Sequence, residues 1–193
     1  MFLYVIDFEM FNDNIIKEIG VSCKYFSTGF LIRPPFPFDK LSANRQKQNF
    51  YVTANIHSIS WDSGNIDYHK ITDLLKYFHN LDAVYMVKGA QKVSQLRILM
   101  PGACVMNLED YGCPKYSELI RRGGFVETNY QLTDQNHCSN CPEWHNGEDM
   151  EHCAEKKAKA FFQWADRNIK TKVAVRKNID TSYDEVDSRV FHV

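Results

Sequence analysis

The chain has 193 residues, of which 44% are hydrophobic and 13% aromatic, enough for one folded domain with a sizeable core; this composition excludes a disordered chain. The 23 basic and 24 acidic residues nearly balance, so total charge neither indicates nor excludes a nucleic-acid partner. No run reaches the roughly 18 apolar residues of a membrane helix, and residues 1–9 lack the basic start of a signal peptide. We therefore expect no membrane association and an intracellular location, cytoplasmic or nuclear.

The order of the predicted elements indicates an α/β fold with a mixed sheet flanked by helices. Apolar runs bounded by turn residues predict strands, and apolar residues at helical spacing predict helices. Three strands come first, and helices then alternate with strands. The polar segment 38–50 is expected to be a loop. The predicted strands cover residues 3–8, 16–25, 30–36, 83–88 and 104–108, and the predicted helices cover 66–80, 91–99, 115–121 and 151–168.

The sequence predicts one domain over residues 1–170 and a C-terminal extension over 171–193, basic at first and then acidic. The stretch from Lys156 to Lys177 contains eight Lys or Arg residues and one acid, Asp166. Such a stretch could follow the phosphates of a nucleic acid. The alternative is a solvated helix face whose charge the acidic tail balances.

Two acidic residues end the first predicted strand. Asp7 and Glu9 are separated by one residue, so their side chains point to the same face. They could therefore share a divalent cation such as Mg²⁺ or Mn²⁺, which prefers oxygen ligands. The alternative is a pair of solvated acids at a strand end.

Four short motifs follow one another along the chain: D-F-E at 7–9, E-I-G at 18–20, I-H-S-I at 56–59 and H-C-A at 152–154. This order resembles the DEDDh 3′→5′ exonucleases of the ribonuclease H-like superfamily, and the resemblance spans about residues 3 to 168. It implies a ribonuclease H-like fold in which Asp7 and Glu9 bind the catalytic metal. It also implies that His152 is the general base that activates water.

The chain departs from this exonuclease pattern at two acids. The second acid is expected near Val93 or Ser94, where none is present, and the last acid is replaced by Lys157. Two-metal phosphoryl chemistry needs several carboxylates to hold cations about 3.5–4 Å apart, so a second Mg²⁺ should bind poorly. Four other acids are conceivable substitutes: Asp73, Glu109, Asp110 and Glu155.

Cysteines and histidines cluster between residues 137 and 153. Cys138, Cys141, His145 and Cys153 supply sulfur and nitrogen ligands at spacings that a tetrahedral Zn²⁺ can gather. The cluster predicts a structural zinc site that orders the surrounding loop. The alternative is an unstructured, redox-labile loop.

Glu18, in the second strand, and Cys153, directly after His152, add a second resemblance. The Maelstrom domain and the exonuclease domain of arenavirus nucleoproteins are ribonuclease H-like folds with a Glu-Cys-His-Cys zinc site, and Glu18 and Cys153 match two of its positions. The resemblance implies His145 as third ligand and Cys138 or Cys141 as fourth. The two middle ligands of those families have the spacing C-x2-H, which this chain lacks. An alternative zinc site made of Cys and His residues alone, without Glu18, is therefore also possible. Many Maelstrom domains have lost the exonuclease carboxylates but keep this zinc site.

Four lysines are candidate nucleic-acid ligands. Lys88 and Lys92 follow the fourth predicted strand and are expected near Asp7 and Glu9, and Lys157 and Lys159 belong to the basic stretch. The leading hypothesis is a nucleic-acid-directed ribonuclease H-like domain that binds single-stranded RNA or DNA, with weak or altered metal-dependent nuclease activity. The alternatives are a catalytically inactive zinc-stabilised module that binds RNA or a protein, and a purely structural zinc domain.

Overall fold

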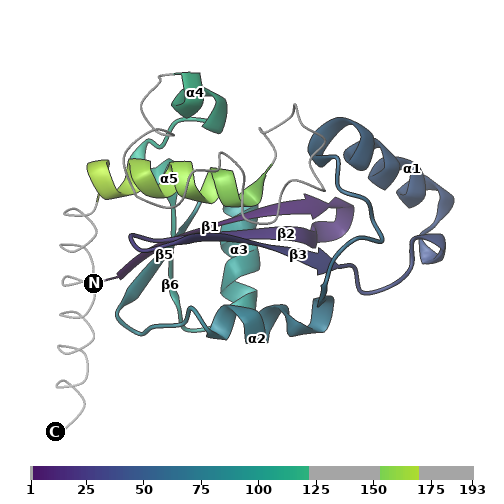
Figure 1. Cartoon of the computed structure of the whole chain (residues 1–193), viewed down its shortest axis with the longest axis horizontal. Helices are drawn as coiled ribbons and strands as arrows, with labels where there is room; N and C mark the ends of the chain where they lie inside the picture. Colours follow the sequence, from purple (N-terminus) through teal and green to yellow (C-terminus); the bar gives the residue numbers. More distant parts are fainter. Residues whose placement is uncertain (1, 122–152, 170–193) are drawn as a thin grey trace, which may run out of the picture.

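In the computed structural model, which describes residues 2–121 and 153–169, six strands form one mixed sheet flanked by helices (Figure 1). Strand β2 is antiparallel to β1 and β3, while β4 runs parallel to β3, β5 to β1, and β6 to β5. The strand order is β4-β3-β2-β1-β5-β6, so β1 lies inside the sheet. The strands are β1 (Phe2–Phe11), β2 (Ile15–Ser22), β3 (Ser27–Arg33), β4 (Ile66–Asp67), β5 (Ala83–Val87) and β6 (Cys104–Asn107).

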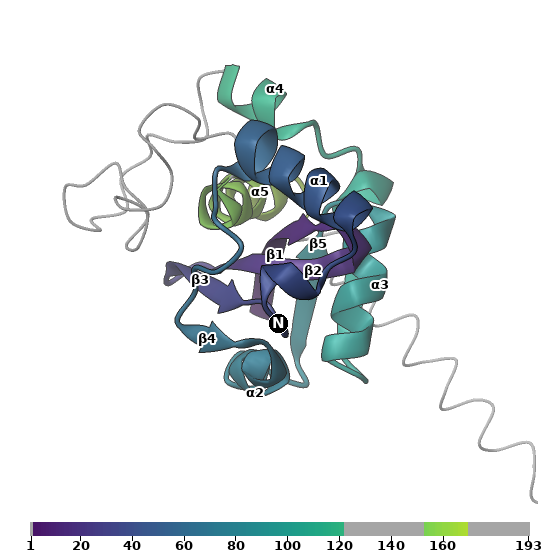
Figure 2. The same ribbon diagram turned by 90° about the vertical axis from the view of Figure 1, so that its right-hand side faces the viewer.

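Helices cover both faces of the sheet, and Figure 2 shows α5 on one face and α2 and α3 on the other. The alternation of β1 explains this, because successive strand residues point to opposite faces. Leu3 and Val5 belong to the core cluster under α5 with Phe161, whereas Ile6 and Phe8 belong to the core cluster under α2 and α3. The helices are α1 (Ala43–Val52), α2 (Ile71–Lys76), α3 (Ala90–Leu99), α4 (Tyr116–Arg121) and α5 (Ala154–Asn168).

The close approach of α5 to β2 depends on Gly20, the glycine of the E-I-G motif. A Cβ atom at Gly20 would lie 2.1 Å from the carbonyl oxygen of Ala154 and 2.4 Å from the backbone nitrogen of Glu155. No side chain fits between backbone atoms at that distance. The missing side chain therefore lets the first turn of α5 rest directly on the sheet.

The prediction of a loop over residues 38–50 is wrong, because residues 43–52 form α1. Ser42 caps this helix by accepting a hydrogen bond from the backbone nitrogen of Arg45. The helix lacks an apolar stripe, because its buried positions are Asn49 and Val52. Asn49 contacts the rest of the fold through a hydrogen bond from the backbone nitrogen of Asn12 to its Oδ1 at 3.0 Å. A helix attached by an amide has no hydrophobic periodicity to detect.

The predicted helix over residues 66–80 is too long. Residues 66–67 form β4 beside β3, a 3-10 turn follows, and α2 covers residues 71–76. The third strand begins earlier than predicted, at Ser27, and ends at Arg33 before the prolines. The other predicted strands and helices agree with the structure to within three residues at each end. Over the described ranges, no helix combines the length and the apolar character needed to cross a membrane. The predicted extension 171–193 lies outside the described residues.

Candidate functional site

The two acids of β1 lie side by side on the buried face that α5 covers. Asp7 is completely buried and Glu9 is 7% exposed. Their neighbours across the β1–β2 pair are Gly20 and Glu18, respectively, so Glu18 shares the same face. The expectation that Asp7 and Glu9 share one face is confirmed, but these acids are buried and not solvated.

A lysine from a different helix pairs with each acid. The Nζ atom of Lys92, in the first turn of α3, lies 2.6 Å from Oδ1 of Asp7, and the Nζ atom of Lys157, in the first turn of α5, pairs with Oε1 of Glu9. The side chains of Lys92 and Lys157 are 20% and 15% exposed, so both pairs are largely withdrawn from water. We call Asp7, Glu9, Lys92 and Lys157 the acid–lysine cluster.

The charges of the cluster depend on one another. Burial raises the pKa of Glu9, an effect that Lys157 opposes and the charge of Asp7 reinforces. Burial alone would lower the pKa of Lys157, but the nearby carboxylates of Glu9 and Asp7 outweigh it and raise this pKa above its ordinary value. The charged form of Lys157 is thus stabilised by the acids beside it.

The acid–lysine cluster does not fit the two divalent cations that the exonuclease resemblance implies. Two carboxylates and two ammonium groups carry a formal net charge of zero, and each lysine stands where a cation would have to meet its carboxylate. One buried carboxylate oxygen, Oδ2 of Asp7, has no hydrogen-bond partner in the described part of the chain. That single oxygen offers much less than the several carboxylates that hold a metal pair.

Three of the conceivable substitute acids have other partners or surroundings. Asp73 pairs with Lys76 on α2, and Glu109 lies 3.6 Å from Lys88. Glu155 faces β3, where a Cβ atom on Gly29 would lie 3.0 Å from its Oε2. None of these acids pairs with a lysine of the cluster through a described contact.

Glu18 and Cys153 meet at the start of α5. The Sγ atom of Cys153 donates to Oε1 of Glu18 at 3.7 Å, and the backbone nitrogen of Ala154 donates to Oε2 of Glu18 at 3.0 Å. Glu18 thus satisfies a backbone N–H that the helix leaves without an intrahelical partner, and places a negative charge at the helix N-terminus. The structure therefore brings together two residues that are 135 positions apart.

This pair fits a zinc ion in its donor chemistry and its spacing. With Zn–S near 2.3 Å and Zn–O near 2.0–2.2 Å, a sulfur and an oxygen on one tetrahedral zinc lie roughly 3.5 Å apart. Burial, with Glu18 beside it, raises the pKa of the Cys153 thiol to about 12, so a bound cation would have to displace its proton. Within the described ranges no group of three or more His, Cys, Asp and Glu side chains gathers around a metal position. His152, Cys138, Cys141 and His145 lie outside those ranges.

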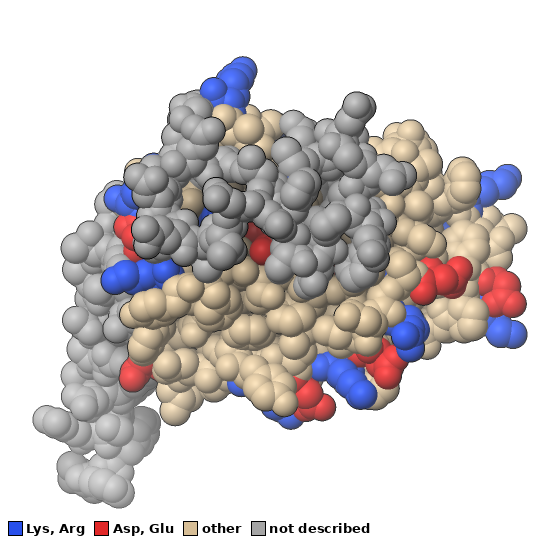
Figure 3. Space-filling view, viewed as in Figure 1, with Lys and Arg blue, Asp and Glu red and all other residues tan. Residues whose placement is uncertain are grey.

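The remaining predicted nucleic-acid ligands do not join the cluster through described contacts. The Nζ atom of Lys88 donates to the carbonyl oxygen of Cys113 at 2.8 Å and lies 3.6 Å from Glu109. Lys159 is half-buried on α5, near Glu155. Burial and the charge of Glu18 raise the pKa of Glu155 to about 7, and the charge of Lys159 only partly opposes this rise. On the face shown in Figure 3, blue and red side chains are interspersed over the part formed by described residues. Charge distribution there marks no single phosphate-binding patch.

His57, of the I-H-S-I motif, is a buried structural residue. Its Nδ1 accepts a hydrogen bond from the backbone nitrogen of Ile59 at 3.1 Å, and its ring packs edge-on against Phe11. Trp61 is likewise a core residue, 4% exposed, whose Nε1 donates to the carbonyl oxygen of Phe36.

Sequence reasoning missed Lys17, which is completely buried in β2. Its Nζ donates to the carbonyl oxygens of Ile32 at 3.2 Å and Trp61 at 2.9 Å, and to that of Ser63. Burial lowers the pKa of Lys17 to about 7. In the sequence Lys17 lies between Ile16 and Glu18, and a charged pair of this kind in a strand gives no sign of the three carbonyl groups that bind the ammonium.

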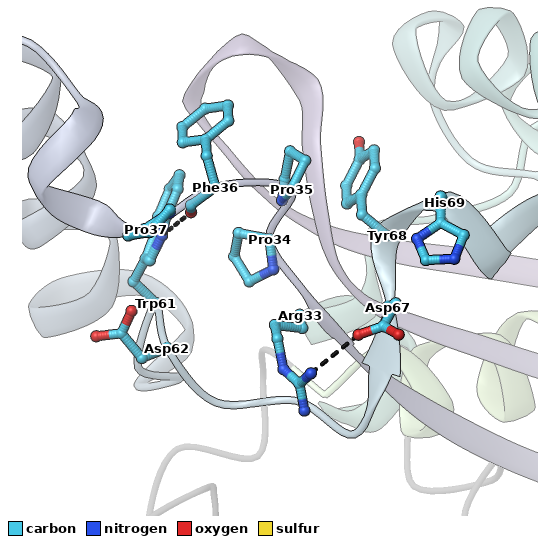
Figure 4. Close-up of a pocket in the computed structure, with 10 residues that line it drawn as sticks. All are labelled: Arg33, Pro34, Pro35, Phe36, Pro37, Trp61, Asp62, Asp67, Tyr68 and His69. Atoms are coloured by element: carbon cyan, nitrogen blue, oxygen red, sulfur yellow. Dashed lines mark hydrogen bonds and ion pairs between the residues drawn. The ribbon is translucent and has the colours of Figure 1, made fainter.

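A cavity of about 490 Å³ lies between the prolines after β3 and the segment around β4 (Figure 4). Arg33 and Asp67, paired at 2.9 Å, close one side of it, and Trp61 and Tyr68 contribute aromatic surface. None of the four cluster residues lines this cavity. The cavity and the acid–lysine cluster are therefore separate features.

Comparison with known proteins adds no relative. No protein-family model, no curated protein and no solved structure matches the chain.

Proposed function

We propose that this chain is a ribonuclease H-like domain that binds single-stranded nucleic acid without cutting it. The observation that carries the proposal is the pairing of both β1 acids with lysines, Lys92 to Asp7 at 2.6 Å and Lys157 to Glu9. The leading hypothesis from sequence was a weak or altered nuclease. The geometry favours the catalytically inactive alternative.

The physical reason lies in the charge that a metal pair requires. A nuclease of the DEDDh type must concentrate negative charge to hold two cations close together. Here the helices that should supply further acids, α3 and α5, supply Lys92 and Lys157 instead. To bind here, divalent cations would have to break two buried ion pairs. The two displaced ammonium groups would then lie close to the bound cations and repel them, which is strongly unfavourable.

The ribonuclease H-like part of the proposal rests on the motif order together with the sheet. The D-F-E motif lies in a central strand, the E-I-G motif lies in its antiparallel neighbour, and β5 and β6 extend the sheet in parallel on the other side. The H-C-A motif lies at residues 152–154, and its last residue begins α5, the helix that covers the acids. Single-stranded RNA or DNA is the substrate class that the resemblance implies, and a protein partner is the alternative.

Zinc is the cofactor that we propose for the start of α5. The 3.7 Å separation of Glu18 Oε1 and Cys153 Sγ supports two ligands of the site, and His145 with Cys138 or Cys141 would complete it. Zinc bound there would fix the first turn of α5 to β2 and hence the position of Lys157. The metal would be structural, because it supplies closed coordination and no reaction step.

The proposal is tested by a cleavage assay paired with a binding assay. Labelled single-stranded RNA and DNA are incubated with the full chain and Mg²⁺, Mn²⁺ or EDTA, beside an Asp7→Asn/Glu9→Gln variant. We expect binding by the wild-type chain and no metal-dependent products. Cleavage that needs Mn²⁺ or Mg²⁺ and disappears in the double variant would establish a nuclease and overturn the proposal. The proposal would also be overturned if the chain bound neither single-stranded RNA nor single-stranded DNA.

The zinc proposal has a separate test. Elemental analysis of protein purified under reducing conditions should find about one zinc per chain, and Cys153→Ser should lower both occupancy and melting temperature. Cys113→Ser is the matched control, because Cys113 is also a buried cysteine outside any disulfide, but its sulfur donates to the carbonyl oxygen of Pro114. Zinc below a tenth of an equivalent in the wild-type chain would refute the site.

A further inference from the structure

Helix α1 has a face on which two aromatic side chains are exposed to solvent. Phe50 is 69% exposed and Tyr51 is 61% exposed, although both are large apolar side chains. Lys47 precedes them by three and four residues, so it is a neighbour of both on the helix surface. We define the α1 face by the exposed residues of this helix and its end: Asn44, Lys47, Gln48, Phe50, Tyr51 and Asn55.

The charge of this region has a single sign. Between Asp39 and Asp62 the chain contains Lys40, Arg45 and Lys47 and no acidic residue. Arg45 pairs with Asp13 at 2.6 Å, whereas Lys47 is exposed and has no ion-pair partner among the described residues. Besides Lys47 and the two aromatic residues, the α1 face consists of the amides Asn44, Gln48 and Asn55, which donate and accept hydrogen bonds without adding charge. A polyanion therefore meets no repulsive carboxylate on α1 itself.

The opposite face of α1 attaches the helix to the end of the central strand. Asn49 accepts hydrogen bonds from the backbone and the side chain of Asn12, directly after β1, and Val52 packs in a core cluster with Phe11 and Trp61. Figures 1 and 2 show α1 at the end of the sheet toward which β1 points. These contacts hold the α1 face next to the end of the strand that carries Asp7 and Glu9.

We infer that the α1 face is a binding surface for single-stranded nucleic acid, in which Phe50 and Tyr51 stack on unpaired bases and Lys47 contacts a phosphate. This inference rests on the proposed function and gives it a location. Exposed aromatic rings interleaved with a cation suit single strands, because every unpaired base offers a flat face for stacking. Lys92 and Lys157 are less suited to this role, since their ammonium groups already neutralise Asp7 and Glu9.

The amides of the α1 face extend this chemistry. Asn44 and Gln48 lie one helical turn apart on the same side as Tyr51. Their side chains can hydrogen-bond base edges or sugar hydroxyls next to a stacked base. A duplex hides its base faces, so it should bind this surface much more weakly than either single strand.

The test measures fluorescence anisotropy of a labelled 20-nucleotide RNA, the DNA of the same sequence and the corresponding duplex, with the full chain. Phe50→Ala/Tyr51→Ala should weaken single-strand binding on the order of ten- to a hundredfold, the loss of one or two stacked bases. Lys47→Ala should reduce the slope of log K against log salt by about 1. Tyr77→Ala/Leu81→Ala is the matched control, because these side chains are 86% and 83% exposed near α2, and it should bind as the wild type does.

The outcomes separate the two proposals. If the wild-type chain binds single strands and the Phe50/Tyr51 variant binds them equally well, the α1 inference is overturned and the proposed function stands. Equal losses in the variant and the Tyr77/Leu81 control would also overturn it. If the wild-type chain binds no probe at low salt, both proposals fail, and a protein becomes the better occupant of this face. Circular dichroism melts of each variant confirm that the exposed substitutions leave the fold intact.

Discussion

Replacing Lys92 with methionine tests the buried pairing on which the argument against a metal pair depends. The change keeps most of the side-chain volume and removes the ammonium 2.6 Å from Asp7. Asp7 is completely buried, and its other oxygen has no described hydrogen-bond partner, so its negative charge would lose its directly bonded ammonium and keep only its interaction with Lys157. Removing one partner of a buried pair costs about 3–5 kcal/mol. Because the Lys92 side chain is 20% exposed and water can enter its place, we expect about 3 kcal/mol.

Urea unfolding followed by circular dichroism measures this loss. With a slope near 2 kcal/mol per molar urea for a domain of this size, about 3 kcal/mol lowers the midpoint by roughly 1.5 M. Lys76→Met is the matched control, since Lys76 also pairs with an aspartate, at 2.8 Å, but both side chains are 69% exposed. The control should not move the midpoint measurably.

The double variant Asp7→Asn/Lys92→Met completes the cycle. Removing both charges takes away the carboxylate left without its ammonium, so the double variant should regain most of the stability that Lys92→Met loses. Asp7→Asn alone should cost less than Lys92→Met, because the lysine can turn its ammonium toward water. A Lys92→Met protein as stable as the Lys76→Met control would refute the buried pair and with it the argument against cation binding.

Three further predictions test other parts of the structure. Replacing the two lysines should create affinity for a divalent cation, because Lys92→Ala/Lys157→Asp changes the formal charge of the cluster from zero to three negative charges. Calorimetry should then detect tighter Mn²⁺ binding by this variant than by the wild-type chain, and equal binding by both proteins would contradict the charge argument. Gly20→Ala should cost at least about 3 kcal/mol or prevent folding, because its Cβ would lie 2.1 Å from the backbone of Ala154. The Cβ of Gly29→Ala would lie 3.0 Å from Oε2 and 3.3 Å from Cβ of Glu155, contacts that need a much smaller shift, so this variant should lose clearly less stability in the same urea assay. Similar losses for both variants would contradict the close approach of α5. Lys17 has a folded-state pKa lowered to about 7, so the unfolded chain binds the additional proton between pH 7 and about 10.5, and stability should rise with pH in that window. The rise from pH 7 to pH 9 should be smaller in Lys17→Met, and an identical rise would show that other groups cause it.

Much of the sheet could be predicted from the sequence, because several of its strands correspond to short apolar runs. The apolar run 3–8 and the short apolar runs at 83–88 and 104–108 correspond to strands buried between two helical layers. Helix α5 was also predictable, since its apolar residues recur at helical spacing. Helix α1 was not, because its contact with the fold is made by Asn49 and its exposed side carries Phe50 and Tyr51.

The candidate site was predictable in its members and not in its pairing. The D-x-E spacing placed Asp7 and Glu9 on one face, and motif order pointed to the replacement at Lys157. The pairing of Lys157 with Glu9 joins residues 148 positions apart, and the pairing of Lys92 with Asp7 joins residues 85 positions apart. No local sequence pattern encodes contacts over such separations. The same holds for Glu18 and Cys153, whose meeting required Gly20 to let α5 approach β2.

These pairings also explain how the fold holds two buried acids on one strand. A buried carboxylate on a central strand is tolerated only when a cation or hydrogen-bond donors compensate it. Lysines from α3 and α5 provide that compensation within the chain, so Asp7 and Glu9 now tie β1 to the two helices that begin beside them. This arrangement gives the two acids a structural role. Replacing them should therefore lower the stability of the chain equally with and without divalent cations. If the acids instead bound a metal, replacing them would lower stability mainly when that metal is supplied.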